Sequence, residues 1–115
     1  MTDAQLTAVM LALCDGASGD EVLEQQMVAV FLERLTLWKE RHRKYGRGNI
    51  ADTGAMGCAV RASDKLARLN EFYIKRVADF PDETVEDSWR DLGNYADMGL
   101  IAHRGDWPGA LRGRA

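Results

Sequence analysis

The stretch SGDEVLEQQMVAVFLERLTLWKERHRK, residues 18–44, decides the fold class of this chain. Ser18 and Glu21 have the spacing of a capping box, in which the serine accepts from an exposed backbone amide and the glutamate reaches back, so a helix is predicted to begin here. Apolar side chains then recur at helical spacing at Leu23, Met27, Val30, Phe31, Leu35 and Trp38. This stripe predicts a helix that runs to about Lys44 and contributes to a core.

Three further helices are predicted around this one. The first covers about Asp3 to Cys14 and is closed by the turn at residues 15–19. After a loop at residues 45–49, another covers about Thr53 to Val77, although two glycines weaken its first turns. The last begins at Thr84 or Asp82 and ends near residues 104–105. Since no strand-like alternation appears, we expect an all-α, antiparallel four-helix bundle or a close relative, or else a larger helical assembly completed by a second chain.

Composition narrows the classes of function. The 115 residues fit one domain, with an N-terminal helix and turn at 1–19, a helical core at 20–105 and a loose tail at 106–115. No run approaches the roughly 18 apolar residues of a membrane span, and the net charge of −3 gives no overall footprint for duplex DNA. Two separated cysteines and the absence of basic residues near Asp3 indicate a cytoplasmic protein without an export signal.

The last predicted helix carries an acidic row. Glu83, Asp87, Asp91 and Asn94 fall on nearly the same side of it, opposite its apolar residues. Carboxylate and amide oxygens that point in one direction suit a hard cation such as Mg²⁺, and a cation would offset the repulsion between the acids. The alternative is a charged face that is simply solvated. Because apolar residues continue on two sides of this helix beyond Tyr95, we also expect the chain to form an oligomer, most simply a dimer.

A cluster of basic residues could offset the negative charge of a bound phosphate group. Arg61, Lys65 and Arg68 cluster with Asp64 at helical spacing, as a triphosphate site requires, although pairing of Asp64 with Arg68 on a wet face explains the same pattern. In the loop that precedes this helix, an ammonium group, an aromatic ring and an amide could contact a base or a sugar. These three are Lys44, Tyr45 and Asn49, of which Tyr45 could instead pack on the end of the bundle.

Three segments, taken in order, resemble a phage and bacterial family. They are Lys44-Tyr45-Gly46 with Asn49, VRASDKLARL at residues 60–69, and EDSWRDLGNYA at residues 86–96. The family is the nucleotide modification associated domain, type 1, and it is similar to the MazG-like all-α nucleoside triphosphate pyrophosphohydrolases. The resemblance covers about residues 32–103. The first thirty or so residues have no counterpart in the family.

The resemblance implies a site and a reaction. MazG-like enzymes hold Mg²⁺ with an EExxE element on one helix and an ExxD element on another. Asp91 and Asn94 resemble the second element, and Asp64 occupies a place in the first, where Lys65 and Arg68 stand instead of further acids. Asp87 and Asp91 would then be catalytic metal ligands, with Asn94 and Asp64 beside them and Glu33 and Glu40 as further candidates.

By this resemblance the protein is a phage-encoded, Mg²⁺-dependent nucleotide-binding domain of the host cytoplasm. If it is an enzyme, it hydrolyses a nucleoside triphosphate, modified or not, to the monophosphate and pyrophosphate. The phosphates would be bound by Arg61, Lys65 and Arg68, and the base or sugar by Lys44, Tyr45 and Asn49. The rival hypothesis is a non-catalytic helical module that binds a nucleotide or a protein, in which acidic and basic stripes only pair across helices.

Overall fold

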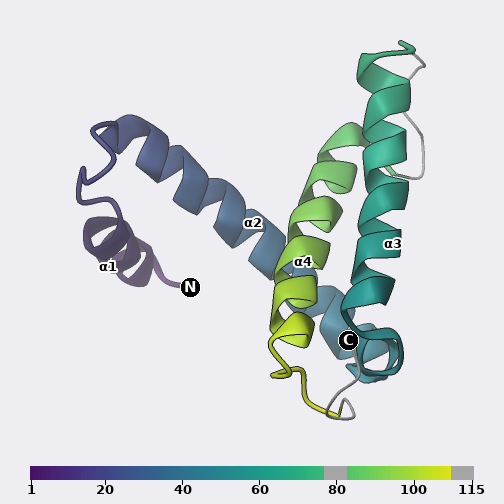
Figure 1. Cartoon of the computed structure of the whole chain (residues 1–115). Coiled ribbons are helices and arrows are strands. Elements are labelled where there is room, and N and C mark those ends of the chain that lie inside the picture. Colours follow the sequence, from purple (N-terminus) through teal and green to yellow (C-terminus); the bar gives the residue numbers. More distant parts are fainter. Residues whose placement is uncertain (77–82, 110–115) are drawn as a thin grey trace. The chain divides into compact units, whose positions relative to one another are not determined.

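The computed structural model describes residues 1–76 and 83–109. Within these ranges the secondary structure consists of helices α1 (Asp3–Leu13), α2 (Glu21–Tyr45), α3 (Gly48–Tyr73) and α4 (Val85–His103), as Figure 1 shows. The all-α prediction is therefore confirmed. Helix α3 ends at Tyr73 with Ile74 as its cap, and Arg76 has a positive φ of 58°, so the prediction that this helix continues to about Val77 is wrong. The alternative fourth-helix start at Asp82 and most of the predicted tail lie outside the described residues. None of the described helices is long and apolar enough to cross a membrane.

The chain divides into two compact units, at residues 1–36 and 37–115. Helix α2 contributes its residues up to Thr36 to the first unit and those from Leu37 onward to the second. The predicted four-helix bundle, the domain boundaries at residues 19 and 105, and the dimer stay predictions.

A single carboxylate holds the turn of the first unit. Glu24 accepts hydrogen bonds from the backbone amides of Gly16 and Ser18, at 2.7 and 2.9 Å, and from the Ser18 hydroxyl at 2.5 Å. These bonds keep the pKa of Glu24 below its usual value. The predicted capping box of Ser18 with Glu21 is wrong, because Ser18 donates to the Glu24 carboxylate and Asp20 accepts from the Leu23 amide at 3.1 Å.

In the second unit, α3 and α4 lie side by side and run in opposite directions (Figure 1). Helix α4 begins as predicted, since the Thr84 side chain accepts from the Asp87 amide and the Asp87 carboxylate accepts from the Thr84 amide, completing a capping box. Its end is also as predicted, with Arg104 as the cap and Gly105 at a φ of +77°.

The core of the second unit lies at the end of the α3–α4 pair where α4 finishes. It consists of Ile50, Ala51, Cys58, Ala102 and Trp107, with Trp38, Ala55 and Met98 packed against it. Trp107 lies in the predicted loose tail, yet it is buried and its indole Nε1 donates to the Arg47 carbonyl at 3.0 Å. The prediction of a loose segment is wrong at this residue because its large apolar ring completes the core.

A kink at Gly54 sets the shape of α3. Gly54 is buried and has φ +65° and ψ −157°, outside the helical region and in a region that essentially only glycine occupies. The helix starts at Gly48, so most of the predicted loop at residues 45–49 is helical and only residues 46–47 separate α2 from α3. The kink therefore turns a first short segment, residues 48–53, away from the line of residues 55–73.

Candidate functional site

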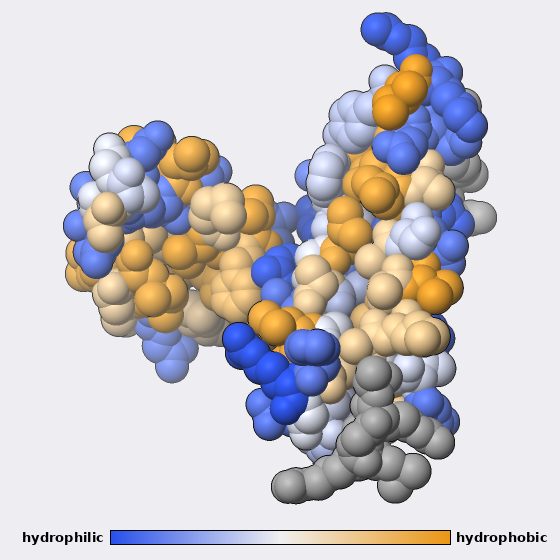
Figure 2. Space-filling view, viewed as in Figure 1, coloured by the Kyte–Doolittle hydropathy of each residue, from blue (hydrophilic) through white to orange (hydrophobic). Residues whose placement is uncertain are grey.

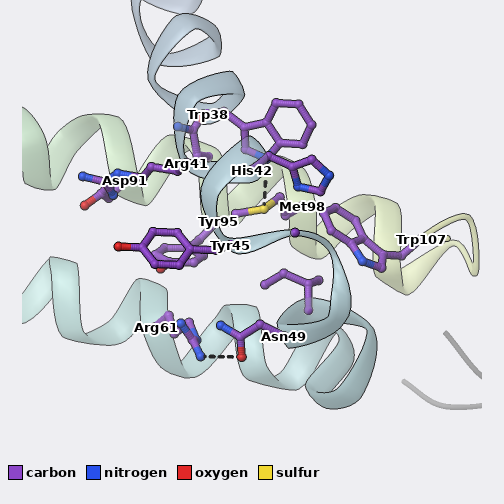
Figure 3. A pocket seen from close by; sticks show the side chains of 13 residues that line it. Trp38, Arg41, His42, Tyr45, Asn49, Arg61, Asp91, Tyr95, Met98 and Trp107 are labelled. Atoms are coloured by element: carbon purple, nitrogen blue, oxygen red, sulfur yellow. Dashed lines mark hydrogen bonds and ion pairs between the residues drawn. The ribbon is translucent and has the colours of Figure 1, made fainter. Parts of the chain in front are cut away.

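A pocket of about 350 Å³ opens in the second unit. It is lined by the last turns of α2, by α3 from its start to its middle and by the middle of α4, and Figure 3 shows the side chains around it. Its lining residues are Trp38, Arg41, His42, Tyr45, Gly46, Asn49, Ile50, Arg61, Asp91, Asn94, Tyr95, Met98 and Trp107. The volume is at the lower end of the range for small-molecule sites, and aromatic and positively charged groups dominate the lining.

Stacked aromatic rings form one wall of the pocket. The Trp38 and His42 rings, one helical turn apart on α2, stack with centroids 4.6 Å apart and an interplanar angle of 15°. The rings of Trp107 and His42 meet at an interplanar angle of 83°, with centroids 6.2 Å apart. The Trp38 indole Nε1 also donates to the Met98 sulfur at 3.3 Å. These contacts hold the rings in place, so the wall is formed without a ligand.

Two arginines reach the pocket from different helices. Arg61 Nη2 on α3 donates to Asn49 Oδ1 at 3.0 Å, and Arg41 on α2 pairs with Asp91 on α4 (Figure 3). Tyr45 is 68% exposed, and Lys44 Nζ lies 5.7 Å from the centroid of the Tyr45 ring. Guanidinium groups beside exposed aromatic rings can bind a planar anion, because each arginine presents several donors in a fixed fork.

Asp91 is the most buried charged group of the site, with a residue exposure of 3%. Its Oδ1 accepts a hydrogen bond from Arg41, and its Oδ2 lies 3.2 Å from Lys65 Nζ in an ion pair whose angle falls outside hydrogen-bond geometry. Two cations from different helices therefore neutralise one carboxylate. Such a pair is expected where a buried charge has to be compensated inside a protein.

Glu83 extends this charge network. Its carboxylate lies 2.5 Å from Lys65 Nζ and 3.5 Å from Arg68 Nη1, and the Ser88 hydroxyl lies 3.4 Å away. Burial alone would raise the pKa of Glu83, but the hydrogen bond and charge of Lys65, with further help from Arg68 and Ser88, hold that pKa below its ordinary value. For Lys65, burial opposes the charged form, whereas Glu83 and Asp91 raise its pKa overall.

Acidification provides a test of this network. Because the folded pKa of Glu83 is depressed, its stabilising effect is complete above the ordinary value of 4.5 and is lost as the pH falls through the folded pKa. We expect wild type to exceed Glu83→Gln in free energy of unfolding above pH 4.5, and this gap to narrow below it. Urea unfolding at a series of pH values, followed by tryptophan fluorescence, measures the gap. The variant Glu86→Gln, at an exposed position, serves as the control. If the difference in free energy of unfolding between wild type and Glu83→Gln stayed the same into strong acid, the depressed pKa of Glu83 would be contradicted.

The structure brings together only part of the predicted site. Tyr45, Asn49, Arg61, Asp91 and Asn94 all line the pocket, whereas the others do not. Lys65 and Arg68 belong to the charge network, Lys44 lies over Tyr45, and Glu40 is exposed. Glu33 belongs to the first unit.

The predicted magnesium ligands do not form one group. Asp87 is held by the Thr84 amide and hydroxyl at 3.2 and 3.0 Å, Asp64 is exposed on α3, and both oxygens of Asp91 face cations. Among residues 1–76 and 83–109, no three His, Cys, Asp or Glu side chains are placed to hold a metal ion. The donor set in this arrangement therefore does not fit a carboxylate-bound Mg²⁺, and the magnesium site stays a prediction.

The residues that sequence reasoning missed are mainly aromatic. The sequence pattern places Trp38 in the core and Trp107 in the tail and gives His42 no role, but all three form the pocket wall. The spacing of Trp38, Arg41, His42 and Tyr45 on one side of a helix was the available signal. Comparison of the chain with protein-family models, with curated proteins and with solved structures finds no match.

Proposed function

We propose that this protein binds a nucleotide in the pocket between Tyr45, Arg61 and Asp91. The observation that carries the proposal is the combination, within about 350 Å³, of two arginines on different helices with a wall of aromatic rings. A nucleotide needs both features, since its base presents a planar face for stacking and its phosphates present oxygens for guanidinium groups. The resemblance of three segments to a nucleotide-related family supports the same conclusion.

Each part of the ligand has a counterpart in the pocket. The base would rest against the exposed ring of Tyr45, and the amide of Asn49 would contact the base or the sugar. The phosphates would lie between Arg61 and Arg41, whose side chain is 44% exposed and keeps donors beyond the one given to Asp91. With this assignment, each of these side chains keeps in the complex the partner that it has in the free protein.

We propose nucleotide binding only, and hydrolysis is tested separately. The MazG-like resemblance implies an Mg²⁺-dependent release of pyrophosphate, but the predicted carboxylate ligands have other partners in the structure. A cation bound to the phosphates themselves could accompany the nucleotide into the pocket. Each binding experiment is therefore made with Mg²⁺ and with a chelator, and pyrophosphate release is assayed alongside.

Substitution of Arg61 is expected to weaken nucleotide binding selectively. Arg61→Gln removes a charge-assisted contact worth about 1.5–3 kcal/mol, so the dissociation constant should rise roughly 10- to 100-fold. Calorimetric titration with ribo- and deoxynucleoside mono- and triphosphates measures this change. Tyr45→Ala should weaken binding of nucleotides but not of inorganic pyrophosphate. Arg43→Gln is the matched control, because Arg43 is exposed on α2 and does not line the pocket.

The rival interpretation, a helical interaction module, predicts a different result. The cross-helix pairs of Asp91 with Arg41 and Lys65 favour a structural role for those particular charges. If the pocket has no ligand function, no nucleotide should raise the melting temperature of the protein, with or without Mg²⁺. Equal loss of binding in Arg61→Gln and Arg43→Gln would indicate nonspecific charge attraction and would also reject the proposed site.

A further inference from the structure

The two arginines of the pocket differ in how far their charge is compensated. Arg41 pairs with the carboxylate of Asp91, which is 3% exposed. Arg61 instead donates to the amide oxygen of Asn49, a neutral group, at 3.0 Å. Among the residues that line the pocket, with histidine counted as neutral at pH 7, two guanidinium groups therefore stand against one carboxylate. The lining has one positive charge in excess, and Arg61 carries it.

We infer that the pocket selects a nucleotide with a single phosphate group, a nucleoside monophosphate, over the corresponding triphosphate. The inference rests on the proposed function, nucleotide binding in this pocket. At pH 7 a phosphate monoester carries about −1.5 to −2 charges. Arg61, together with the remaining donors of Arg41, can bind this group and offset much of its charge. Each further phosphate adds negative charge, for which the lining offers no further cation.

The other basic residues of the predicted triphosphate site are engaged outside the pocket. Lys65 does not line it and lies 2.5 Å from Glu83 and 3.2 Å from Asp91. Arg68 lies 3.5 Å from the same Glu83 carboxylate. Lys44 does not line the pocket either. These cations are therefore not placed to bind a polyphosphate chain within the pocket.

Asp91 acts against a longer phosphate chain. Its carboxylate lines the pocket and is held by Arg41 and Lys65, so it cannot turn away from a ligand. A phosphate chain that reaches Arg41 also approaches Asp91, and this meeting of like charges disfavours the more highly charged ligand. Because both oxygens of Asp91 already face cations, an Mg²⁺ carried by a triphosphate would have to displace one of them to bind this carboxylate. Asp91 is thus the specificity-determining residue.

Titration calorimetry of the full chain with the mono-, di- and triphosphates of each common nucleoside tests the inference, once in a chelator and once with Mg²⁺. The monophosphate that binds most tightly should bind at least about tenfold more tightly than its triphosphate in both conditions, because of the like-charge contact. A triphosphate that binds as tightly as its monophosphate, in either condition, would overturn the inference and leave nucleotide binding in place. If no nucleotide binds, the proposed function itself fails, and the inference fails with it.

Two variants connect this preference to the charges of the lining. Asp91→Asn, in conditions where far-UV circular dichroism shows it folded, should lower the ratio of the triphosphate to the monophosphate dissociation constant by about threefold or more. Asn49→Asp, at an exposed position, gives Arg61 a carboxylate partner and should bring the affinity for the monophosphate close to that for the nucleoside. This second variant tests the inference if Asp91→Asn does not fold. An unchanged ratio in folded Asp91→Asn, or unchanged monophosphate binding in Asn49→Asp, would overturn the inference.

Hydrophobic side chains also lie outside the pocket on α3 and α4, as Figure 2 shows. Among them Trp89 is 50% exposed, donates to the Tyr73 hydroxyl at 3.1 Å and does not line the pocket. A base could stack on this ring without any selection by charge. Trp89→Leu is therefore the control and should keep the affinities for both the monophosphate and the triphosphate. Loss of monophosphate binding in Trp89→Leu would place the base at Trp89 and overturn the inference.

Discussion

The variant Gly54→Ala should lower the free energy of unfolding of the second unit by about 2–3 kcal/mol, because alanine is strained at a positive φ that only glycine adopts readily. Urea unfolding followed by tryptophan fluorescence reports this unit directly, since Trp38, Trp89 and Trp107 all belong to it. Gly48→Ala is the control. Gly48 is at the start of α3 with open space around it, so alanine there should be neutral or slightly stabilising.

The same substitution should also disrupt the pocket. Asn49 and Arg61 are twelve residues apart, a separation of about 18 Å along a straight α-helix, yet their side chains hydrogen-bond at 3.0 Å. The kink at Gly54 makes this contact possible by turning the first segment of α3 back toward the second. Gly54→Ala should therefore abolish nucleotide binding under conditions where the variant is still folded. Equal stability and binding for Gly54→Ala and Gly48→Ala would show that the kink is not required.

Asp91→Asn is expected to lower the free energy of unfolding by about 3 kcal/mol, the lower end of the cost of breaking a buried ion pair. The lower end applies because Arg41 stays partly solvated and Lys65 keeps Glu83 as a partner. Glu86→Gln is the control. That residue is 82% exposed and pairs with Arg90 at 3.6 Å, so its loss should cost at most about 0.5 kcal/mol.

The opposite outcome for Asp91→Asn would support the metal site that the resemblance implies. If Asp91 were one of several mutually repelling magnesium ligands, removing its charge would leave stability unchanged or raise it slightly and would abolish an Mg²⁺-dependent response to nucleotide. Unfolding and binding measured on this one variant therefore separate a structural carboxylate from a metal ligand.

Much of the helical architecture could be predicted because it depends on local signals. The start of α4 at Thr84 and its end near Gly105 follow from a capping box and a terminal glycine. The start of α3 could not be predicted in this way. Gly48 and Gly54 weaken a helix locally, and the segment between them is helical because Ile50 and Ala51 pack in the core formed with Trp107, which is distant in sequence.

The residues of the candidate site could likewise be predicted only in part. Tyr45 and Asn49 could be proposed from residue type and from their place in the loop predicted at residues 45–49, and Arg61 from its cluster with Lys65 and Arg68. The pairing of Asp91 with Arg41 could not be predicted, since Arg41 lies fifty residues away and the acidic row on α4 is equally typical of a metal site or a solvated face. Only the folded structure, which brings Arg41 of α2 and Lys65 of α3 to this carboxylate of α4, shows that side chains neutralise it.

The pairs that close the pocket have a consequence for the order of folding. Trp38 with Met98 and Arg47 with Trp107 are each separated by sixty residues, whereas α3 and α4 are neighbours along the chain. Closing the longer loops costs more chain entropy, so the α3–α4 hairpin should form early and the aromatic wall should dock late. The binding site would then be assembled in the last step of folding, and a bound ligand would chiefly slow unfolding.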